Sequence, residues 1–223
     1  DGEGDSSKLK AETEALERSV YSSAKSISQK RKASASKMAD GVESVLSKLG
    51  MPGTKFSVSI VEKDGTDVTQ ICNPYGMDSV EFLISANPGS PLLPLAKIAS
   101  GGELSRVMLA LKTIFAQNDP VETMIFDEID TGIGGEIAVA IGSHIKNLSK
   151  NKQILCITHL ASIAVYADNQ IKVEKGLSGQ SVKTAVHHVS GEDRVSEIAR
   201  MLSGDPGSAE SREHARSMLE KFS

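Results

Sequence analysis

Two neighbouring carboxylates, Asp127 and Glu128, directly follow the apolar run 124–126. The carboxyl end of a parallel strand presents its last residues at the edge of the sheet where ligands bind. At such an edge one carboxylate can hold Mg²⁺ through water while the next polarises an attacking water molecule. Asp130 adds a third acid within reach. An acidic loop after a strand is the ordinary alternative, but the pairing of two carboxylates favours the chemical interpretation.

A glycine turn, Ser100-Gly101-Gly102-Glu103, stands before an amphipathic segment and could bind a phosphate. Two glycines let the backbone approach a ligand closely. The helix that follows would direct its free N–H groups and the positive end of its dipole toward an anion. The Ser100 hydroxyl adds a donor, and the set would suit a γ-phosphate. Ser100 with Glu103 three residues later is also a capping box, and the turn taken alone favours that ordinary helix start.

His159 follows the apolar run 154–157 and Thr158. If this run and the one before Asp127 form neighbouring strands, His159 reaches the same sheet edge, where it could bond a phosphate oxygen or orient water. A helix-capping or exposed histidine explains this residue alone equally well. The remaining histidines have no metal-ligand spacing, and we interpret them as structural or surface residues: His144, His187, His188 and His214.

The sequence lacks the glycine-rich loop that cradles the phosphates of a nucleotide. That loop needs Gly-x-x-x-x-Gly-Lys-Ser/Thr, and no Gly-Lys pair occurs in the chain. The nearest approximation, at 50–57, places Lys55 out of register. We therefore expect the chain to complete a nucleotide site but not to hold a nucleotide alone. Since it begins with Asp1 rather than Met, we also expect a fragment or a processed product.

Composition limits the class of protein. The 223 residues, 39% of them hydrophobic, suffice for one large domain or for one domain with an appendage. The net charge of −4 excludes an overall basic protein, so any DNA contact would need a local patch, a partner or further chain. A buried thiol is favoured over a disulfide for Cys156. Without a signal peptide or an apolar stretch of about 20 residues, we expect a cytoplasmic protein that makes no membrane contact.

The elements that must position these residues begin with a long helix. We expect disorder at 1–7, because the segment is Gly, Ser and acid, and a coiled-coil arm helix at 8–50, ended by Gly50 and Pro52. A heptad seam with one stutter runs along the arm through Leu9, Leu16, Val20, Ile27, Met38, Val42, Val45 and Leu49. Polar residues at three core positions weaken this seam, so we expect the arm to pack against a partner helix.

The segment 51–223 is expected to form a lobe in which strands alternate with helices. Strands are predicted near 56–60, 80–84, 123–126, 153–157, 170–174 and 182–188, the last two as a hairpin. Helices are predicted near 103–116, 135–148, 194–202 and 209–222, with a short one from about 160. Apolar strands that alternate with helices predict an α/β fold with a mostly parallel sheet flanked by helices.

The order of these pieces is more specific than any one of them. A glycine signature, a strand ending in Asp-Glu, an Asp-containing turn and a strand ending in Thr-His together resemble the C-terminal lobe of an ABC-type ATPase head, a P-loop fold. The preceding arm narrows the resemblance to the SMC-like branch, in which the arm separates the two halves of the head. Within that branch, the segments 97–106, 126–135 and 156–160 resemble a family of bacterial DNA-repair proteins.

The resemblance implies a role for each matching residue. A signature that reaches the γ-phosphate held by the opposite head would comprise Ser100, Gly101, Gly102 and Glu103. Asp127 would be the Walker B carboxylate at Mg²⁺, and Glu128 would be the general base. Asp130 would lie in the D-loop at the dimer seam, and His159 would be the switch histidine. Ala99 departs from the leucine usual in ABC signatures.

The family implies an ATPase of DNA double-strand break repair and recombination, with ATP and Mg²⁺ as cofactors. Its partners would be the N-terminal half of the same head, a second head in an ATP-sandwiched homodimer, and DNA through the assembled protein. Hydrolysis is expected only when the half that carries the Walker A loop is supplied. Two alternatives stay open: a non-catalytic scaffold or interaction module that binds through 8–49, and another ABC-type ATPase lobe such as that of a transporter.

Overall fold

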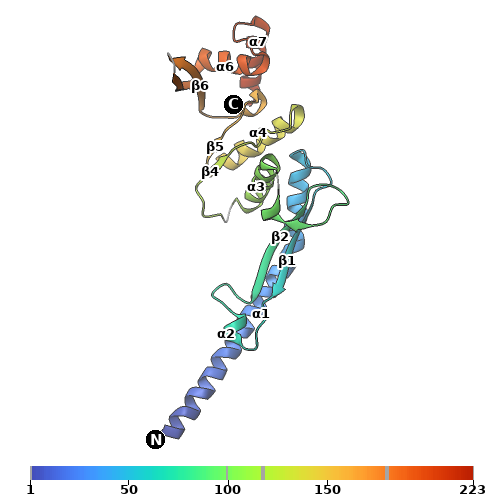
Figure 1. The fold of residues 1–223 in the computed structure, drawn as a ribbon, viewed down its shortest axis with the longest axis vertical. Helices are drawn as coiled ribbons and strands as arrows, with labels where there is room; N and C mark the ends of the chain where they lie inside the picture. Colours follow the sequence, from blue (N-terminus) through green and yellow to red (C-terminus); the bar gives the residue numbers. More distant parts are fainter. Residues whose placement is uncertain (1, 99, 117–118, 179–180, 223) are drawn as a thin grey trace. The chain divides into compact units, whose positions relative to one another are not determined.

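The computed structural model describes residues 2–98, 100–116, 119–178 and 181–222 (Figure 1). It falls into two compact units. The arm unit comprises Asp1–Ser44 and Gly53–Ile98, and the lobe unit comprises Val45–Pro52 and Ala99–Ser223. This division differs from the expected boundary at residue 50, because residues 53–98 group with the arm.

Helix α1, Gly2–Lys48, is a single helix of 47 residues. It includes residues 2–7, for which the composition predicts disorder. Adding residues to an existing helix costs little, because each new residue gains one backbone hydrogen bond once the helix is nucleated. The polar segment therefore continues the helix that the sequence predicts from Lys8.

The predicted seam of α1 is buried only toward its C-terminal end. Val42, Val45 and Leu49 are buried, whereas the N-terminal seam residues are exposed, Leu9 by 64% and Leu16 by 63%. Val20 and Ile27 are exposed as well. The sequence predicts a partner helix for the arm as a whole, and the exposed half of the seam leaves apolar residues accessible to one.

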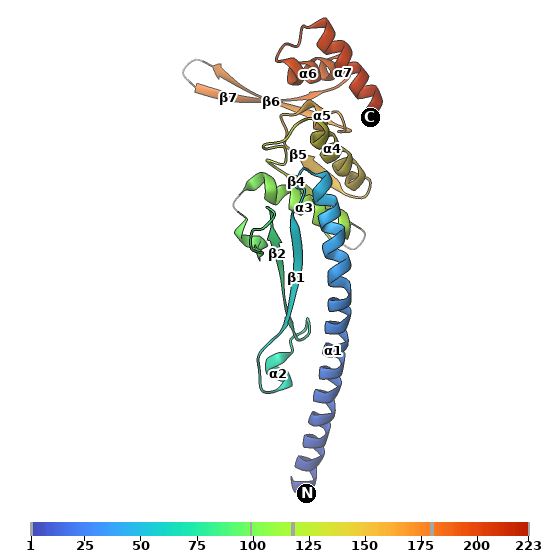
Figure 2. The same ribbon diagram turned by 90° about the vertical axis from the view of Figure 1, so that its right-hand side faces the viewer.

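The arm unit also contains a three-stranded antiparallel sheet. Strand β1, Lys55–Glu62, pairs along its whole length with β2, Asp78–Ser85, and β3, Leu93–Pro94, pairs with the end of β2. β1 and β2 run alongside α1 (Figure 2). The short helices are α2, Val68–Ile71, which is N-capped by the Asp67 carboxylate, and η1, Leu95–Lys97.

Side-chain hydrogen bonds tie this sheet to α1. The Glu43 carboxylate accepts hydrogen bonds from the Phe56 N–H at 3.0 Å and from Lys55 Nζ at 2.9 Å. The buried Asp78 carboxylate accepts from Ser28 Oγ at 2.6 Å and from Arg31 Nη1 at 2.9 Å. These contacts explain why residues 53–98 belong to the arm unit.

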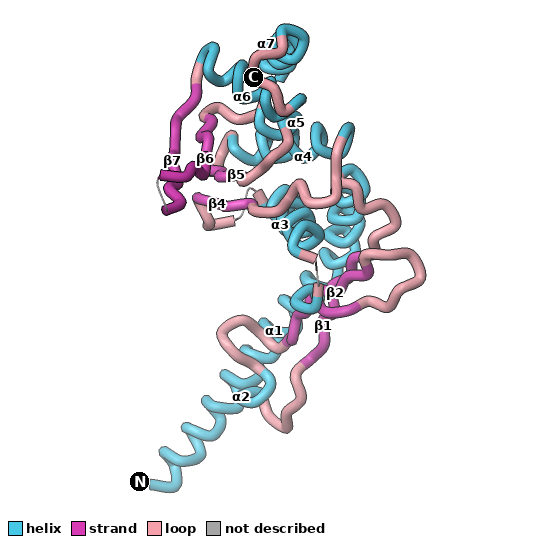
Figure 3. Tube along the Cα trace, turned by 45° about the horizontal axis from the view of Figure 1, so that its top comes forward, coloured by secondary structure: helices cyan, strands magenta, loops and turns pink. Residues whose placement is uncertain are grey.

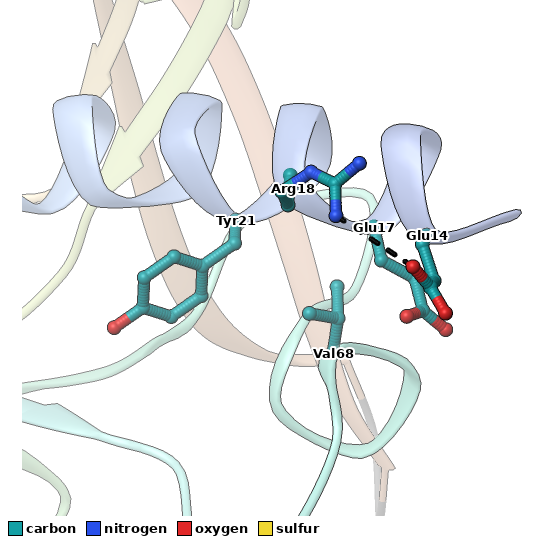
Figure 4. Close-up of a pocket in the computed structure, with 5 residues that line it drawn as sticks. All are labelled: Glu14, Glu17, Arg18, Tyr21 and Val68. Carbon is teal, nitrogen blue, oxygen red and sulfur yellow. Dashed lines mark ion pairs between the residues drawn. The ribbon is translucent and has the colours of Figure 1, made fainter. Parts of the chain in front are cut away.

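An open pocket lies between α1 and α2 in the arm unit (Figure 4). It is lined by Glu14, Glu17, Arg18, Tyr21 and Val68. Arg18 and Glu14 form an ion pair at 3.8 Å, and both side chains are more than half exposed. An ion pair that is this exposed contributes little to stability, so the pocket is a solvated surface of the arm.

The lobe unit has the predicted alternation of helices and strands. Its elements are α3, Gly101–Phe115; β4, Thr123–Phe126; α4, Gly135–Ser149; β5, Gln153–Cys156; α5, Ala161–Ala164; β6, Gln170–Ser178; β7, Ser181–Val189; α6, Gly191–Ser203; and α7, Ala209–Phe222. β4 and β5 lie side by side and parallel (Figure 3), and β6 and β7 form the expected antiparallel hairpin. Among the described strands, parallel pairing is confined to β4 and β5.

The core of the lobe unit is aliphatic. The apolar spacing of α4 predicts an inward face of Ile137, Ile141, Ile145 and Leu148, and the last three are buried. In α3 the spacing predicts a face of Leu104, Val107, Met108 and Leu111. Val107 and Leu111 are buried, whereas Leu104 and Met108 are exposed and Arg106 is buried. A second cluster joins α5, α6 and α7 through Ala161, Ala164, Val165, Val195, Ile198, Ala199 and Ala215.

Cys72 and Cys156 are both free thiols. Of the helices in the part of the chain that the structure describes, none combines the length and the apolar character needed to span a bilayer.

Candidate functional site

The parallel pairing of β4 and β5 brings the acidic loop and the histidine to one edge of the lobe unit. Phe126 lies opposite Cys156 in the register, and the Ile157 N–H donates to the Phe126 carbonyl at 2.9 Å. Asp127 and His159 therefore follow the carboxyl ends of adjacent strands, the position where α/β sheets bind ligands. The predicted strands before Asp127 and His159 are therefore neighbours in the sheet.

Asp130 holds the His159 segment in place. Its carboxylate is buried, with 4% of the residue exposed. One oxygen, Oδ2, accepts from Thr158 Oγ1 at 2.5 Å and from the His159 N–H at 2.9 Å, and it lies 3.0 Å from His159 Nδ1. The resemblance places Asp130 at a dimer seam, but within this chain its carboxylate points inward and orients the histidine.

The ring of His159 stays largely in solvent, with 74% of its side chain exposed. A neutral ring that donates from Nδ1 to Asp130 leaves Nε2 as an acceptor, and a protonated ring makes Nε2 a donor. This arrangement fixes one side of the ring and leaves the other available to a ligand.

The acidic pair lies on a strained turn. Asp127 and Glu128 are both exposed, and the Glu128 N–H donates to Asp127 Oδ1 at 2.9 Å. Glu128 has a φ of 57°, and among the described residues no other non-glycine has a positive φ. This conformation costs a side-chain-bearing residue about 1–2 kcal/mol, and such strain is typical of functional sites. The Thr131 N–H closes the turn onto the Glu128 carbonyl at 3.1 Å.

The glycine turn lies against this acidic turn. A Cβ on Gly101 would clash with Glu128 Oε2, and one on Gly102 would come within 3.0 Å of the Glu128 carbonyl. Ser100 is the N-cap of α3 and accepts from the Glu103 N–H at 3.4 Å, as in an ordinary helix start. An N-cap does not require contact with the acidic turn. The two glycines therefore also allow the backbone of the glycine turn to lie close to Glu128. Ala99 lies outside the described residues.

Two residues of α3 that sequence reasoning missed hold the acidic loop. Ser105 Oγ donates to the Asp127 carbonyl at 2.7 Å, and Arg106 Nη1 donates to the carbonyls of Ile129 at 3.4 Å and Thr131 at 3.2 Å. Arg106 is only 7% exposed, and burial lowers the pKa of its guanidinium from the usual value. A charged residue on the apolar face of a helix is the signal that could have revealed it.

The acidic edge also affects a neighbouring thiol. Burial, Asp130 and Asp127 together raise the pKa of Cys156 to about 12. The thiol therefore stays protonated at neutral pH and is not a nucleophile.

The donor set fits a magnesium ion that is held partly by its substrate. Among the residues that the structure describes, no group of three or more His, Cys, Asp or Glu side chains could enclose a metal. Mg²⁺ is usually bound by one or two carboxylates together with water and phosphate oxygens. The exposed carboxylate of Asp127 suits that mode of binding.

Comparison with known proteins identifies the family. The DNA repair protein RecN of Treponema pallidum is 52% identical over 216 residues, which cover 97% of this chain and 38% of that protein. RecN of Streptomyces coelicolor is 40% identical and RecN of Bacillus subtilis 39%, over 94% and 96% of the chain. Over the length that it spans, the chain belongs to the RecN family. The DNA-repair family predicted from the motif segments is therefore confirmed.

The chain spans about two fifths of the length of these RecN relatives, 38% in each of the three. No protein-family model matches it. The activity and partners of a whole RecN protein are therefore proposals for this chain.

Solved structures confirm the fold class. The Smc head domain with a coiled coil and joint from Pyrococcus yayanosii matches 98% of this chain, and 35% of its own length, with a TM-score of 0.56. The Smc head domain of Pyrococcus furiosus, solved with the C-terminal domain of ScpA, matches 83% and 43%, with a TM-score of 0.53. Both are 20% identical to the chain, so they show an SMC-like head fold alone.

Proposed function

We propose that this chain is the part of a RecN-like ATPase that supplies the signature, the Walker B carboxylate, the general base and the switch histidine. The observation that supports this proposal is the meeting of three predicted pieces at one edge: the turn Ser100–Gly102, the acidic residues 127–130, and His159. Hydrolysis of ATP requires a phosphate loop, which must come from a segment outside this chain.

In this proposal Asp127 holds Mg²⁺ through water. The ion would neutralise charge on the β- and γ-phosphates. Asp127 Oδ1 already accepts the Glu128 N–H, which restrains the Asp127 carboxylate against the backbone of the proposed base. Glu128 accepts the proton of the attacking water from its strained turn. His159, oriented by Asp130, would direct Nε2 toward a phosphate oxygen or the water.

The N-terminus of α3 would bind the γ-phosphate of an ATP held by a second head. Its 15 residues give a full helix dipole, and Gly101 and Gly102 leave the backbone accessible. In this chain Glu128 Oε2 lies over Gly101. Two negative groups cannot share that surface, so we expect the Glu128 side chain to turn away when the phosphate arrives.

The partners follow from the same arrangement. We propose the N-terminal half of the head, a second copy in an ATP-sandwiched homodimer, and DNA bound through the assembled protein. The RecN relatives are named as DNA repair proteins, which supports a role in DNA repair. The finer role that we propose is double-strand break repair and recombination, in the cytoplasm.

A non-catalytic interaction module is the second candidate. The exposed apolar residues of α1, such as Leu9 and Leu16, favour a partner for the arm. They do not explain the strained acidic pair beside the glycine turn, so we prefer the ATPase.

The test supplies the phosphate-loop segment, covalently or in trans, and compares two variants. Glu128→Gln should retain ATP binding, abolish most hydrolysis and trap a paired state that elutes as a larger species in size-exclusion chromatography. Glu136→Gln removes an exposed carboxylate from the first turn of α4 and should behave like the wild type. Normal hydrolysis by Glu128→Gln would contradict the assignment of the base.

A further inference from the structure

The buried guanidinium of Arg106 differs from that of Arg194, a half-buried arginine of the lobe unit. Arg194 donates from Nη2 to the Ala167 carbonyl at 2.6 Å and from Nε to Gln170 Oε1 at 3.3 Å. The Nε of Arg106 is buried and has no hydrogen-bond partner among the residues that the structure describes. An orphan of this kind is rare and calls for an explanation beyond packing.

Arg106 and Ser105 hold alternate carbonyls of the acidic loop. Ser105 binds the carbonyl of Asp127, and Arg106 binds those of Ile129 and Thr131. The residues between these carbonyls are Glu128 and Asp130, one the proposed base and the other the residue that orients His159. Side chains of α3 thus bind the backbone on each side of Glu128 and Asp130.

The strain at Glu128 explains why such a grip is needed. A positive φ at a glutamate persists only when its surroundings fix the backbone on both sides. Arg106 supplies two hydrogen bonds from a charged donor, at 3.4 and 3.2 Å, and Ser105 supplies a shorter one at 2.7 Å, so both residues restrain the loop. These bonds leave the Nε donor of Arg106 unused.

We propose that Arg106, assisted by Ser105, is a positioning residue that aims Glu128 and couples it to the N-terminus of α3. A phosphate bound at Ser100–Gly102 would act on the same rigid helix that carries both residues. The hydrogen bonds from Ser105 and Arg106 to the loop lie within this chain and need no partner. Their effect on catalysis rests on the proposed ATPase function.

The first test measures amide hydrogen exchange in the full chain. Arg106→Lys keeps the charge but removes the planar fork that reaches two carbonyls. We expect exchange of the Thr131 amide, which donates to the Glu128 carbonyl, to become about tenfold faster. The matched control, Arg194→Lys, should leave this amide unchanged and speed exchange in 164–170 instead.

Unchanged exchange at Thr131 in a folded Arg106→Lys chain would overturn the proposal. If that variant does not fold, Ser105→Ala removes the neighbouring bond to the Asp127 carbonyl and should speed exchange in the same loop by a smaller factor. A folded Ser105→Ala chain with wild-type exchange would overturn it equally.

The second test uses the protein assembled with its phosphate-loop segment. Arg106→Lys should lower kcat about tenfold and leave the KM for ATP unchanged, because the residue acts through Glu128 and not on the nucleotide. In a Glu128→Gln background, adding Arg106→Lys should cause no further loss. Independent, multiplicative losses would overturn the proposal. An assembled wild type without ATPase activity would refute the proposed function, while the exchange measurement still decides the positioning role.

Discussion

At the scale of single residues, the site depends on close approach between two turns. The glycine turn at 101–102 lies against the acidic turn at 127–131, where a Cβ on Gly101 would meet Glu128 Oε2 and a Cβ on Gly102 would meet the Glu128 carbonyl. A substitution in either turn can change the free energy of unfolding, the rate of hydrolysis or both, so the two quantities are measured separately.

Gly101→Ala makes this separation directly. Alanine suits a helix better than glycine, so the free energy of unfolding should stay the same or rise by up to about 1 kcal/mol. The new Cβ would displace Glu128 Oε2, and hydrolysis by the assembled protein should fall. Chemical denaturation and steady-state ATPase assays measure the two effects. Gly134→Ala adds a Cβ in open space and is the control. Full activity in Gly101→Ala would count against the contact.

The thiol of Cys156 gives a prediction for alkaline pH. Its folded-state pKa of about 12 is above the ordinary value of 9.0. Between these values the unfolded chain loses the proton and the folded chain keeps it, so this group's contribution to stability is lost as pH rises. Urea unfolding from pH 8 to 10.5 should show a steeper loss for the wild type than for Cys156→Ala. Parallel curves would contradict the assignment.

At the scale of elements, long segments were predictable and short ones were not. The strands predicted at 123–126 and 153–157 agree with β4 and β5 to within one residue, because apolar, β-branched runs bounded by polar residues favour strands. β3 was missed, because Pro94 carries no strand signal and is placed by pairing with Leu83. α2 was missed because it is a single turn that depends on the Asp67 cap.

The candidate site was predictable at the level of residue type and spacing. Asp127, Glu128 and His159 follow the ends of two paired strands, because an apolar run that the sequence shows ends just before each of them. The inward turn of Asp130 and the carbonyls that Arg106 binds could not be predicted, because both result from tertiary hydrogen bonds between segments more than 20 residues apart.

Within the arm unit, the Asp78 contacts should fix the sheet on α1. Burial acts to raise the pKa of Asp78, but hydrogen bonds from Ser28 and Arg31 outweigh it and hold the pKa below the usual 3.8. This stabilisation is therefore present above pH 4 and is lost as pH falls below it. Asp78→Ala leaves Arg31 without its partner and should lower the free energy of unfolding by about 3 kcal/mol. Asp64→Ala, on the exposed connection after β1, is the control for urea denaturation.

Above the scale of elements, the chain presents surfaces that suit assembly with further polypeptide. The exposed seam of α1 carries Leu9, Leu16, Val20 and Ile27. Leu16→Glu should leave the unfolding of the chain itself unchanged, because that side chain is exposed, and should weaken binding of a coiled-coil partner helix at least tenfold in a pull-down titration. Ser22→Glu, at an exposed position of the same helix outside the seam, is the matched control.

The central claim is that this chain completes an ATP site whose phosphate loop lies elsewhere. The most direct measurement compares steady-state ATP hydrolysis by the chain alone, by the chain with the phosphate-loop segment supplied, and by that assembly with Asp127→Asn. The account predicts background activity for the first, Mg²⁺-dependent turnover for the second, and a loss of at least about a hundredfold for the third. Turnover by the chain alone, or an Asp127→Asn assembly as active as the wild type, would contradict it.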